Sequence, residues 1–258
     1  MSEFRHNEEC MGTVFQFFGR SDREPTSAIA EAVKVLHELD QIFSLYKQAS
    51  PLSRLARGES SMSELPEIVS FVWDECQRWE DRTDGWFSSM SEGNIFDPSG
   101  FVKAFATVQA ANKLNELGVI DFAINAGGDI YLAPGISSGF PKRVGIAKAE
   151  SITNTVSPLT VLDLSGSYYF AVATSGNAER GEHIWNPKNY SYANQLQQVT
   201  VVAKDLITAD VLATAIFASG DQAQSLITKF AEDVEVLVID KAGDNFATPG
   251  FSKLVAPV

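Results

Sequence analysis

Two oxygen-bearing side chains stand four residues apart in an otherwise apolar stretch, residues 208–214. On a helix, Asp210 and Thr214 would project from the same face. A carboxylate among apolar neighbours is costly to bury without a partner. A carboxylate and a hydroxyl at this spacing suit a hard cation such as Mg²⁺, with phosphate oxygens and water completing the octahedron. The structural alternative places Asp210 in the first helical turn, favoured by the helix dipole, with Thr214 bonded back to a carbonyl.

A glycine-containing turn with a lysine behind it could bind phosphate. Residues 97–100, Asp-Pro-Ser-Gly, precede a helical pattern over Phe101–Leu117, with Lys103 expected in its first turn. Free N–H groups at a helix start, the helix dipole and a nearby lysine all attract phosphate. A helix cap with a surface lysine is the structural alternative. The segment is not a Walker A loop, because Gly-x4-Gly-Lys-[Ser/Thr] is absent.

Two polar segments follow predicted strands. Residues 125–129, Asn-Ala-Gly-Gly-Asp, would let a backbone approach a ligand closely, although a plain turn is the favoured interpretation. They lack the GxGxxG that a Rossmann site needs. The second segment, after residues 173–176, contains His183 in a Gly/Asn/Pro-rich loop, where functional residues concentrate. Ser175 lacks the strand–turn–helix setting of a hydrolase nucleophile. His6, near a terminus expected to fray, and His37, within a helix, are interpreted as structural or incidental.

The elements that would position these groups follow from periodicity. Helical spacing of apolar residues predicts helices over Glu24–Leu45 (N-cap Thr26 or Ser27), Pro66–Arg82, Phe101–Leu117, Ile207–Ser219 and Gln222–Phe230. Runs rich in Val, Ile and Tyr predict strands at Phe122–Asn125, Arg143–Ala147, Val156–Leu164, Tyr168–Thr174, Gln198–Ala203 and Val234–Asp240. Helices dominate the first half and strands the second, which favours an α+β class.

Composition restricts the partners. The 258 residues carry 20 basic and 33 acidic side chains, a formal charge of −13, which argues against nucleic-acid or anionic-membrane partners. Two cysteines and three scattered histidines give neither a disulfide framework nor an HExxH-type metal motif. No apolar stretch approaches the roughly 20 residues of a membrane span. The N-terminus is charged where a secretory signal is apolar, so we expect a cytoplasmic protein.

Taken together and in order, these segments resemble the ApbE family of flavin transferases (FAD:protein FMN transferases). The resemblance covers nearly the whole chain, at residues 11–13, 43–46, 53–55, 83–85, 97–103, 125–129, 173–176, 183–187, 199–201, 208–210 and 213–214. The form Asp-Pro-Ser-Gly-x-Val-Lys is similar to a compact branch of the family. Three positions depart from the family's pattern: Pro51 replaces a common glutamate, Ala104 a usual glycine and Asn186 a usual aspartate. The methyl group of Ala104 could crowd the dinucleotide.

The resemblance implies an ApbE-like, T-fold-related mixed α/β fold, a single domain over residues 1–258 with two subdomains flanking an FAD cleft. It implies that Asp210 and Thr214 hold Mg²⁺ together with the backbone carbonyl of Val102, and that His183 helps to deprotonate the acceptor. The dinucleotide contacts that it implies are Met11, Gly12, Thr13, Tyr46, Asp97, Ser99, Gly100, Lys103, Gly127, Gly128, Asp129, Ser175 and Gly176.

The reaction implied by the resemblance is Mg²⁺-dependent transfer of FMN from FAD to a threonine or serine hydroxyl of an acceptor flavoprotein, with release of AMP. Acceptors of the family carry an Asp-Gly-x-[Ser/Thr]-Gly-Ala-Thr type motif. This sequence lacks that motif, so it resembles the transferase and not its target. Two alternatives stay open. Water as the acceptor would split FAD into FMN and AMP, and a flavin-binding protein would hold FAD without turnover.

Overall fold

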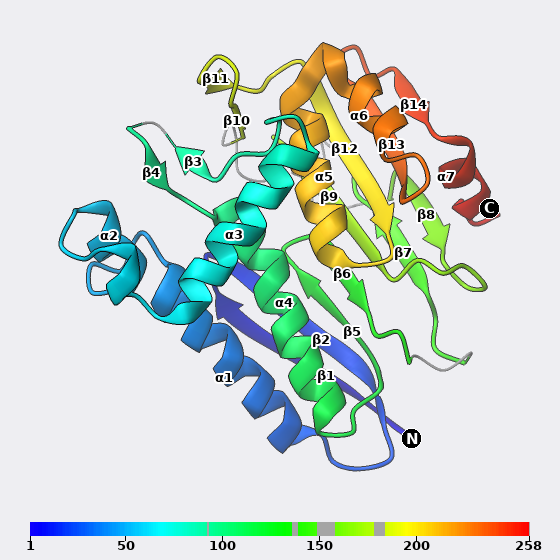
Figure 1. Cartoon of the computed structure of the whole chain (residues 1–258). Helices are drawn as coiled ribbons and strands as arrows, with labels where there is room; N and C mark the ends of the chain where they lie inside the picture. Colours follow the sequence, from blue (N-terminus) through cyan, green and yellow to red (C-terminus); the bar gives the residue numbers. More distant parts are fainter. Residues whose placement is uncertain (92, 136–138, 149–157, 178–183, 258) are drawn as a thin grey trace. The chain divides into compact units, whose positions relative to one another are not determined.

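The computed structural model describes residues 1–91, 93–135, 139–148, 158–177 and 184–257. These residues form two compact units. The first comprises Met1–Gly127 with Ala133–Ile136, and the second comprises Gly128–Leu132 with Ser137–Val258. In each unit helices pack against antiparallel strands (Figure 1), so the predicted α+β class is confirmed. The single domain over residues 1–258 stays a prediction.

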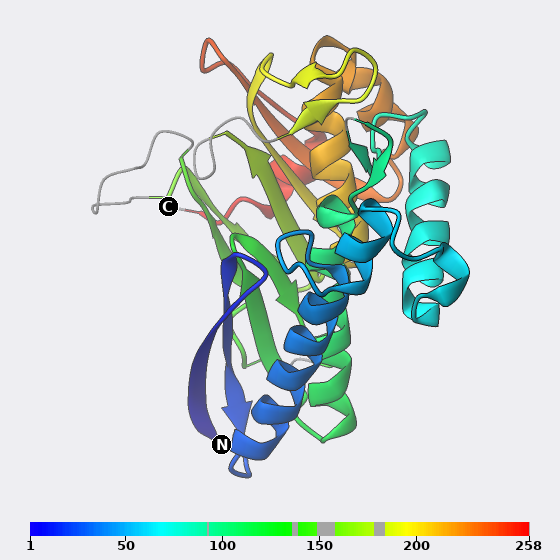
Figure 2. The same cartoon turned by 90° about the vertical axis from the view of Figure 1, so that its left-hand side faces the viewer.

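The first unit is built on three antiparallel strands. Its strands are β1 (Ser2–Cys10), β2 (Thr13–Ser21) and β5 (Asp121–Ala126), with β2 in the centre. Phe15 and Phe17 are buried whereas the alternate residues Val14 and Gln16 are exposed, as the period of two along a strand requires. Figure 2 shows helices α1 and α4 on one side of this sheet.

The helices of the first unit are α1 (Thr26–Phe43), α2 (Pro51–Ala56), a 3₁₀ turn η1 (Met62–Glu64), α3 (Glu67–Arg82) and α4 (Ser99–Glu116). The strands β3 (Met90–Ser91) and β4 (Ile95–Phe96) form a short hairpin between α3 and α4. Helices α1 and α4 pack against each other. The core of the unit lies between these two helices and the sheet, where Leu36, Leu114, Phe122 and Ile124 are fully buried.

The second unit is also built on an antiparallel sheet. Its strands, in spatial order, are β6 (Asp129–Leu132), β9 (Ala171–Gly176), β12 (Leu196–Ala203), β13 (Val234–Asp240) and β14 (Asn245–Ala247). Two hairpins stand apart from it, β7 (Arg143–Ile146) with β8 (Thr160–Asp163), and β10 (Trp185–Asn186) with β11 (Ser191–Tyr192). Its helices are α5 (Leu206–Ser219), η2 (Gly220–Gln222), α6 (Ala223–Lys229) and α7 (Pro249–Leu254).

Helix α5 is the most buried helix of the second unit, and it packs on β9 and β12. The apolar residues of α5 are distributed around its whole circumference, which is the pattern of a core helix and not of a surface helix. Its start is fixed by Asp205, whose side chain accepts a hydrogen bond from the Thr208 amide at 2.8 Å. None of the described helices has the length and apolar character needed to cross a membrane.

Two local predictions are wrong. The N-terminus does not fray at His6, because residues 2–10 form β1 and pair with β2 along their whole length. Phe4 and Cys10 are the only apolar residues of β1, so the strand signal lies in its partner and not in its own sequence. The N-cap of α1 is Pro25, and Thr26 is already the first helical residue.

Candidate functional site

Asp210 and Thr214 lie one turn apart on α5, so the predicted helix is confirmed at these positions. Asp210 is the fifth residue of the helix and not part of its first turn. The helix start is capped by Asp205, so the dipole does not account for Asp210. Asp210 is 6% exposed, in a helix whose other buried residues are almost all apolar. Burial of a carboxylate is costly unless it is paired, hydrogen-bonded or bound to a metal ion.

Thr214 also departs from the structural alternative. Its Oγ1 lies 3.3 Å from Oγ of Ser175, which joins α5 to β9. Thr83 and Thr107 show the ordinary behaviour, since their hydroxyls donate to carbonyls four residues earlier at 2.7 and 2.8 Å. The hydroxyl of Thr214 therefore has its hydrogen-bonding partner on the neighbouring strand β9 and not on its own helix.

The donors on α5 fit a hard cation. A carboxylate and a hydroxyl are the oxygen ligands that Mg²⁺ accepts, and Mg²⁺ usually keeps several waters and substrate phosphates as well. Within the described residues there is no group of three or more His, Cys, Asp or Glu side chains that could hold a metal ion by themselves. The third predicted donor, Val102, belongs to the first unit, whereas Asp210 and Thr214 belong to the second. The joint metal site stays a prediction.

The predicted phosphate site is the start of α4. Lys103 is the fifth helical residue, so it lies in the second turn and not in the first. Asp97 Oδ1 accepts from the Ser99 amide at 3.0 Å, and the carbonyl of Pro98 accepts from the third and fourth helical amides at 2.8 and 2.9 Å. Three of the first four amides of α4 therefore have acceptors within the chain. A phosphate at this end would rely on Lys103 and the Gly100 amide.

The predicted flavin contact at residues 11–13 is a tight hairpin turn. Met11 and Gly12 have φ of +52° and +69°, the left-handed conformation of a two-residue turn between antiparallel strands. A Cβ on Gly127 would collide with Oγ1 of Thr13, and Gly127 itself has φ of +59°. Glycine is therefore required at 127 both for space and for conformation. The first unit ends at this residue, and the second unit begins at the next residue, Gly128.

Tyr46 lies at the surface of the first unit with 98% of its area exposed. Its loop is ordered by Ser44, whose Oγ accepts from the amides of Tyr46 and Lys47 at 3.2 Å each. The carbonyl of Ser44 accepts from the hydroxyl of Ser53 at 3.0 Å. The backbone of Tyr46 is thus held in place while its ring remains accessible to a ligand.

Two of the four predicted contacts in the second unit, Asp129 and Ser175, are buried, whereas Gly128 is exposed and Gly176 is half-buried. Asp129 is 1% exposed, and its Oδ1 accepts from the Thr174 amide at 3.1 Å, which anchors β6 to β9. Ser175 is 7% exposed and bonded to α5 as described above. A Cβ on Gly176 would approach the carbonyl oxygen of Gln197 to 2.9 Å, so this glycine allows β9 and β12 to pair closely. Their contact with a dinucleotide stays a prediction.

His183 lies outside the described residues. The next residue, Ile184, is buried, and its carbonyl accepts from the Ala193 amide at 2.8 Å. The hairpin β10–β11 then begins at Trp185, whose ring lies 4.3 Å from that of Tyr192. Strand β10 also contacts α5, so the segment that follows His183 is anchored to the second unit. The catalytic role of His183 stays a prediction.

Sequence reasoning missed a polar cluster beneath the Met11 turn. Glu8 accepts from Nε2 of His37 at 2.7 Å and contacts Nε2 of His6 at 3.3 Å. Cys10 Sγ lies 3.8 Å from Nδ1 of His37. Of the two interpretations given to His37, structural or incidental, these contacts support the structural one. No sequence signal joins Glu8 and His37, which are 29 positions apart, and the strand that places Glu8 and Cys10 on one face was not predicted.

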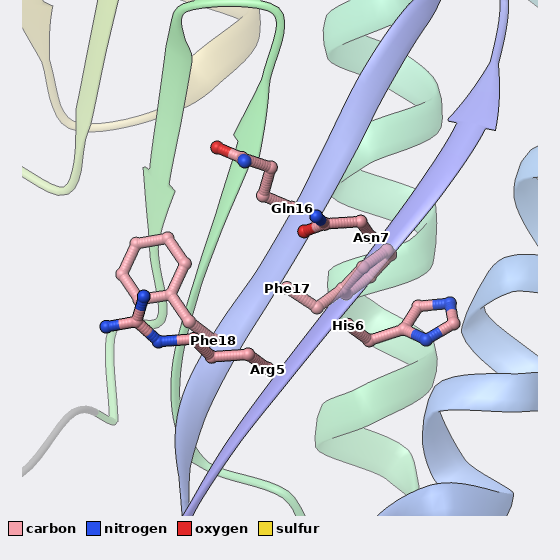
Figure 3. Close-up of a pocket in the computed structure, with 6 residues that line it drawn as sticks. All are labelled: Arg5, His6, Asn7, Gln16, Phe17 and Phe18. Atoms are coloured by element: carbon pink, nitrogen blue, oxygen red, sulfur yellow. The ribbon is translucent and has the colours of Figure 1, made fainter.

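A shallow pocket of about 390 Å³ lies on the β1–β2 hairpin, and Figure 3 shows its lining. Arg5 and Phe18 lie side by side there, whereas the His6 ring points the opposite way. The six lining residues are Arg5, His6, Asn7, Gln16, Phe17 and Phe18. None of them is a predicted site residue, so this pocket is separate from the predicted contacts.

Comparison with known proteins identifies the family. A family model described as the ApbE family matches residues 90–238, more than half of the chain. This chain belongs to the ApbE family. A curated relative from Haemophilus influenzae, named FAD:protein FMN transferase, is 28% identical over 161 residues, covering 60% of this chain and 46% of the relative. One of the same name from Vibrio cholerae is 28% identical over 159 residues, covering 58% and 46%. The chain thus spans about half the length of these curated relatives.

Solved ApbE structures share the fold. The ApbE protein of Thermotoga maritima has a TM-score of 0.82 at 18% identity, covering 99% of this chain and all of the other. The flavin transferase ApbE of Vibrio cholerae has a TM-score of 0.80 at 21% identity, covering 98% and 99%. The ApbE-like fold expected from the sequence is therefore confirmed.

The three departures from the ApbE pattern have local explanations. Pro51 is the first residue of α2, a position that favours proline, and Ser50 caps that helix. Asn186 Oδ1 accepts from the Lys188 amide at 2.9 Å, a bond that an aspartate could also make. Ala104 is fully buried, so its methyl group packs within the protein and does not protrude from α4 into solvent.

Proposed function

We propose that this chain transfers the FMN moiety of FAD to a threonine or serine hydroxyl of an acceptor flavoprotein, with Mg²⁺ as cofactor and AMP as the second product. The main support is the pair of Asp210 and Thr214 on the buried helix α5, in a chain of the ApbE family whose curated relatives are named FAD:protein FMN transferase. Both side chains are hard oxygen donors on one helix face.

FAD binding in this proposal uses residues of both units. The Met11–Thr13 turn and the exposed Tyr46 ring contact the dinucleotide in the first unit, and Lys103 neutralises phosphate charge at the start of α4. In the second unit the backbone around Gly128 and Gly176 allows close approach, because neither residue carries a side chain.

Asp210, Thr214 and the carbonyl of Val102 would hold the Mg²⁺ ion, which when bound offsets the phosphate charge that repels a nucleophile. Lys103 adds a second positive charge through its flexible side chain. Ser175 holds Oγ1 of Thr214 in position through a hydrogen bond between the two hydroxyl groups, in the manner of groups that support a metal ligand.

The chemical step forms one P–O bond and breaks another. The oxygen of the acceptor hydroxyl bonds to the FMN-side phosphorus of FAD, and the bond from this phosphorus to the bridging oxygen breaks, so that AMP leaves with that oxygen. His183 takes the proton of the acceptor hydroxyl. A general base of this kind contributes about 10²–10⁴-fold to the rate.

The acceptor in this proposal carries an Asp-Gly-x-[Ser/Thr]-Gly-Ala-Thr type segment, and the reaction takes place in the cytoplasm. Incubation of the protein with FAD, Mg²⁺ and a peptide containing this segment tests the function, with mass spectrometry as the readout. A peptide that gains an FMN moiety supports the proposal. A peptide in which the acceptor threonine is replaced by valine is the matched control, because it has no hydroxyl.

Two other outcomes contradict the proposed transfer. Free FMN and AMP without modified peptide indicate that water is the acceptor. Bound FAD that is recovered intact indicates a flavin-binding protein without turnover. A fluorescence titration with riboflavin and FAD gives an independent check, because contacts to both halves of the dinucleotide require tighter binding of FAD.

A further inference from the structure

The polar cluster beneath the Met11 turn has a defined direction of hydrogen bonding. The ionised Glu8 carboxylate only accepts hydrogen bonds, so Nε2 of His37 must be the donor of the 2.7 Å contact. In a neutral imidazole the other nitrogen is then an acceptor. The thiol of Cys10, 3.8 Å from Nδ1, is the donor that faces it. The neutral state of His37 therefore links Cys10 to Glu8.

The thiol of Cys10 is suited to donating. Burial, together with the Asp40 carboxylate, raises the pKa of Cys10 to about 11, so its proton is retained at neutral pH. Cys10 is the last residue of β1 and pairs with Thr13 across the turn. A contact made by Cys10 therefore acts directly on the backbone that leads into Met11.

The turn needs such support because its conformation is strained. Met11 has φ of +52°, in the left-handed region that residues with a side chain rarely adopt. On one side the turn is confined by the close approach of Thr13 to Gly127. On the other side it is tied to α1 through the contact between Cys10 and His37.

We propose that His37 is a positioning residue for the Met11–Thr13 turn, and that protonation of its imidazole releases the turn. This inference rests on the proposed function, because the turn is a proposed contact of FAD. Protonation converts Nδ1 from an acceptor to a donor, so the Cys10 S–H loses its acceptor and only its sulfur, a weak acceptor, is left to face the ring. The bond to Glu8 persists, since a protonated imidazole still donates through Nε2.

The surroundings of His37 are defined on each side. From β1 it faces Glu8 and Cys10, and Glu8 in turn contacts His6. On α1, Glu38 follows His37, and Lys34 and Asp40 lie about one turn away; these groups form the ion pairs Lys34–Glu38 and Lys47–Asp40. The side chain of His37 is 45% exposed, so solvent protons reach it directly. Histidine is the side chain that changes charge between about pH 5 and 8, which sets the range to study.

Backbone hydrogen exchange of the Met11–Thr13 amides tests the inference without FAD. Protection factors of these amides, corrected for intrinsic exchange, are compared between about pH 8 and about pH 6. In the wild type we expect protection to fall roughly three- to tenfold at the lower pH, the scale of one lost hydrogen bond. His37→Gln should remove this pH dependence, whereas His6→Gln should keep it, because His6 does not contact Cys10.

Cys10 provides a second pair of variants in case His37→Gln weakens the fold. Cys10→Ala should show low protection at both pH values, and Cys10→Ser should restore the wild-type profile, because its hydroxyl still donates. Cys76→Ala is the control for loss of a buried thiol elsewhere. The inference would be overturned if His37→Gln or Cys10→Ala kept the pH dependence of the wild type. It would also be overturned if the protection of the turn amides in the wild type did not change between the two pH values.

FAD titrations on the same preparations connect the turn to binding. The wild type should lose about three- to tenfold more FAD affinity than His37→Gln between the two pH values. An equal loss in both proteins would overturn the link between the turn and FAD. A wild type that binds no FAD at either pH would refute the proposed function, and the exchange experiment would still decide the role of His37.

Discussion

The hydroxyl oxygens of Ser175 and Thr214 lie 3.3 Å apart and join β9 to α5. The preceding residue of β9, Thr174, makes a similar contact on the opposite face, 3.0 Å from Oγ1 of Thr200 on β12. Strand β9 is therefore tied by hydroxyl groups on both of its faces. Because Thr214 is fixed against this strand, its position is set by the sheet as well as by its own helix.

We expect Thr214→Val to weaken Mg²⁺ binding while the fold persists. Valine keeps the shape of threonine but lacks the oxygen, so the metal loses a ligand and Ser175 loses its partner. The apparent Mg²⁺ affinity should fall at least about tenfold, the usual scale for a change in a metal's immediate surroundings. Thr214→Ser, which keeps the hydroxyl, is the matched control.

Mg²⁺ is titrated into Thr214→Val, and its binding is measured by calorimetry and by transfer activity. Asp210→Asn should have a larger effect than Thr214→Val, because it removes a charge as well as a ligand. Unchanged Mg²⁺ affinity in Asp210→Asn, in a protein with wild-type circular dichroism, would show that the ion binds elsewhere.

We expect His183→Ala to affect the chemical step more than FAD binding. The family resemblance gives His183 the role of accepting a proton from the acceptor, and a lost general base costs about 10²–10⁴-fold in rate. FAD affinity should stay within a few-fold of the wild type. Single-turnover kinetics and a binding titration on one preparation separate the two effects. Lost binding with preserved turnover of the bound FAD would make His183 a ligand contact.

Gly127→Ala should destabilise the first unit. The new methyl group meets Oγ1 of Thr13, and φ of +59° is strained for alanine. Strain and crowding together should cost about 2–4 kcal/mol. Gly243→Ala separates the two terms, because Gly243 has φ of +87° but nothing within 4 Å of an added Cβ, so it should cost only about 1–2 kcal/mol. Urea denaturation measures both, and equal losses would exclude the steric contribution.

Acid should remove the contribution of Glu8 to stability. The hydrogen bond from His37, with a smaller one from His6, holds the pKa of Glu8 below its ordinary value of 4.5. A group with a lowered pKa in the folded state stabilises the protein above the unfolded pKa, and this stabilisation is lost as the pH falls through the folded value. The wild type should exceed Glu8→Gln in stability at about pH 6, and the two should converge towards about pH 3.5. Parallel curves over this range would contradict the assignment.

The buried helices were predictable because their patterns are local. The apolar run around Asp210 defined α5 almost to the residue, and the turn at Asp97 placed the start of α4 within two residues. The same spacing argument put Asp210 and Thr214 on one face. Strand β1 was not predictable in this way, because its alternation is carried by polar residues and its stability comes from pairing with β2.

The partners of the site residues could not be predicted from local patterns. Ser175 and Thr214 are 39 positions apart, and Glu8 and His37 are 29 apart, so only the folded chain joins them. Asp129 illustrates the same limit from the other direction. The family resemblance gives it a ligand contact, and no local pattern indicates that its buried carboxylate also accepts from the backbone of β9.

The burial of both native thiols makes the chain convenient for site-specific labelling. Cys76 is buried as Cys10 is, and burial raises its pKa to about 12. Thiol reagents attack the thiolate, so neither native cysteine should react readily at neutral pH. A cysteine introduced at Tyr46, which is 98% exposed, would then be modified selectively. Because the Tyr46 ring is itself a proposed FAD contact, a fluorophore or spin label at this position would show whether FAD still binds without that ring, while the contact between Cys10 and His37 stays intact.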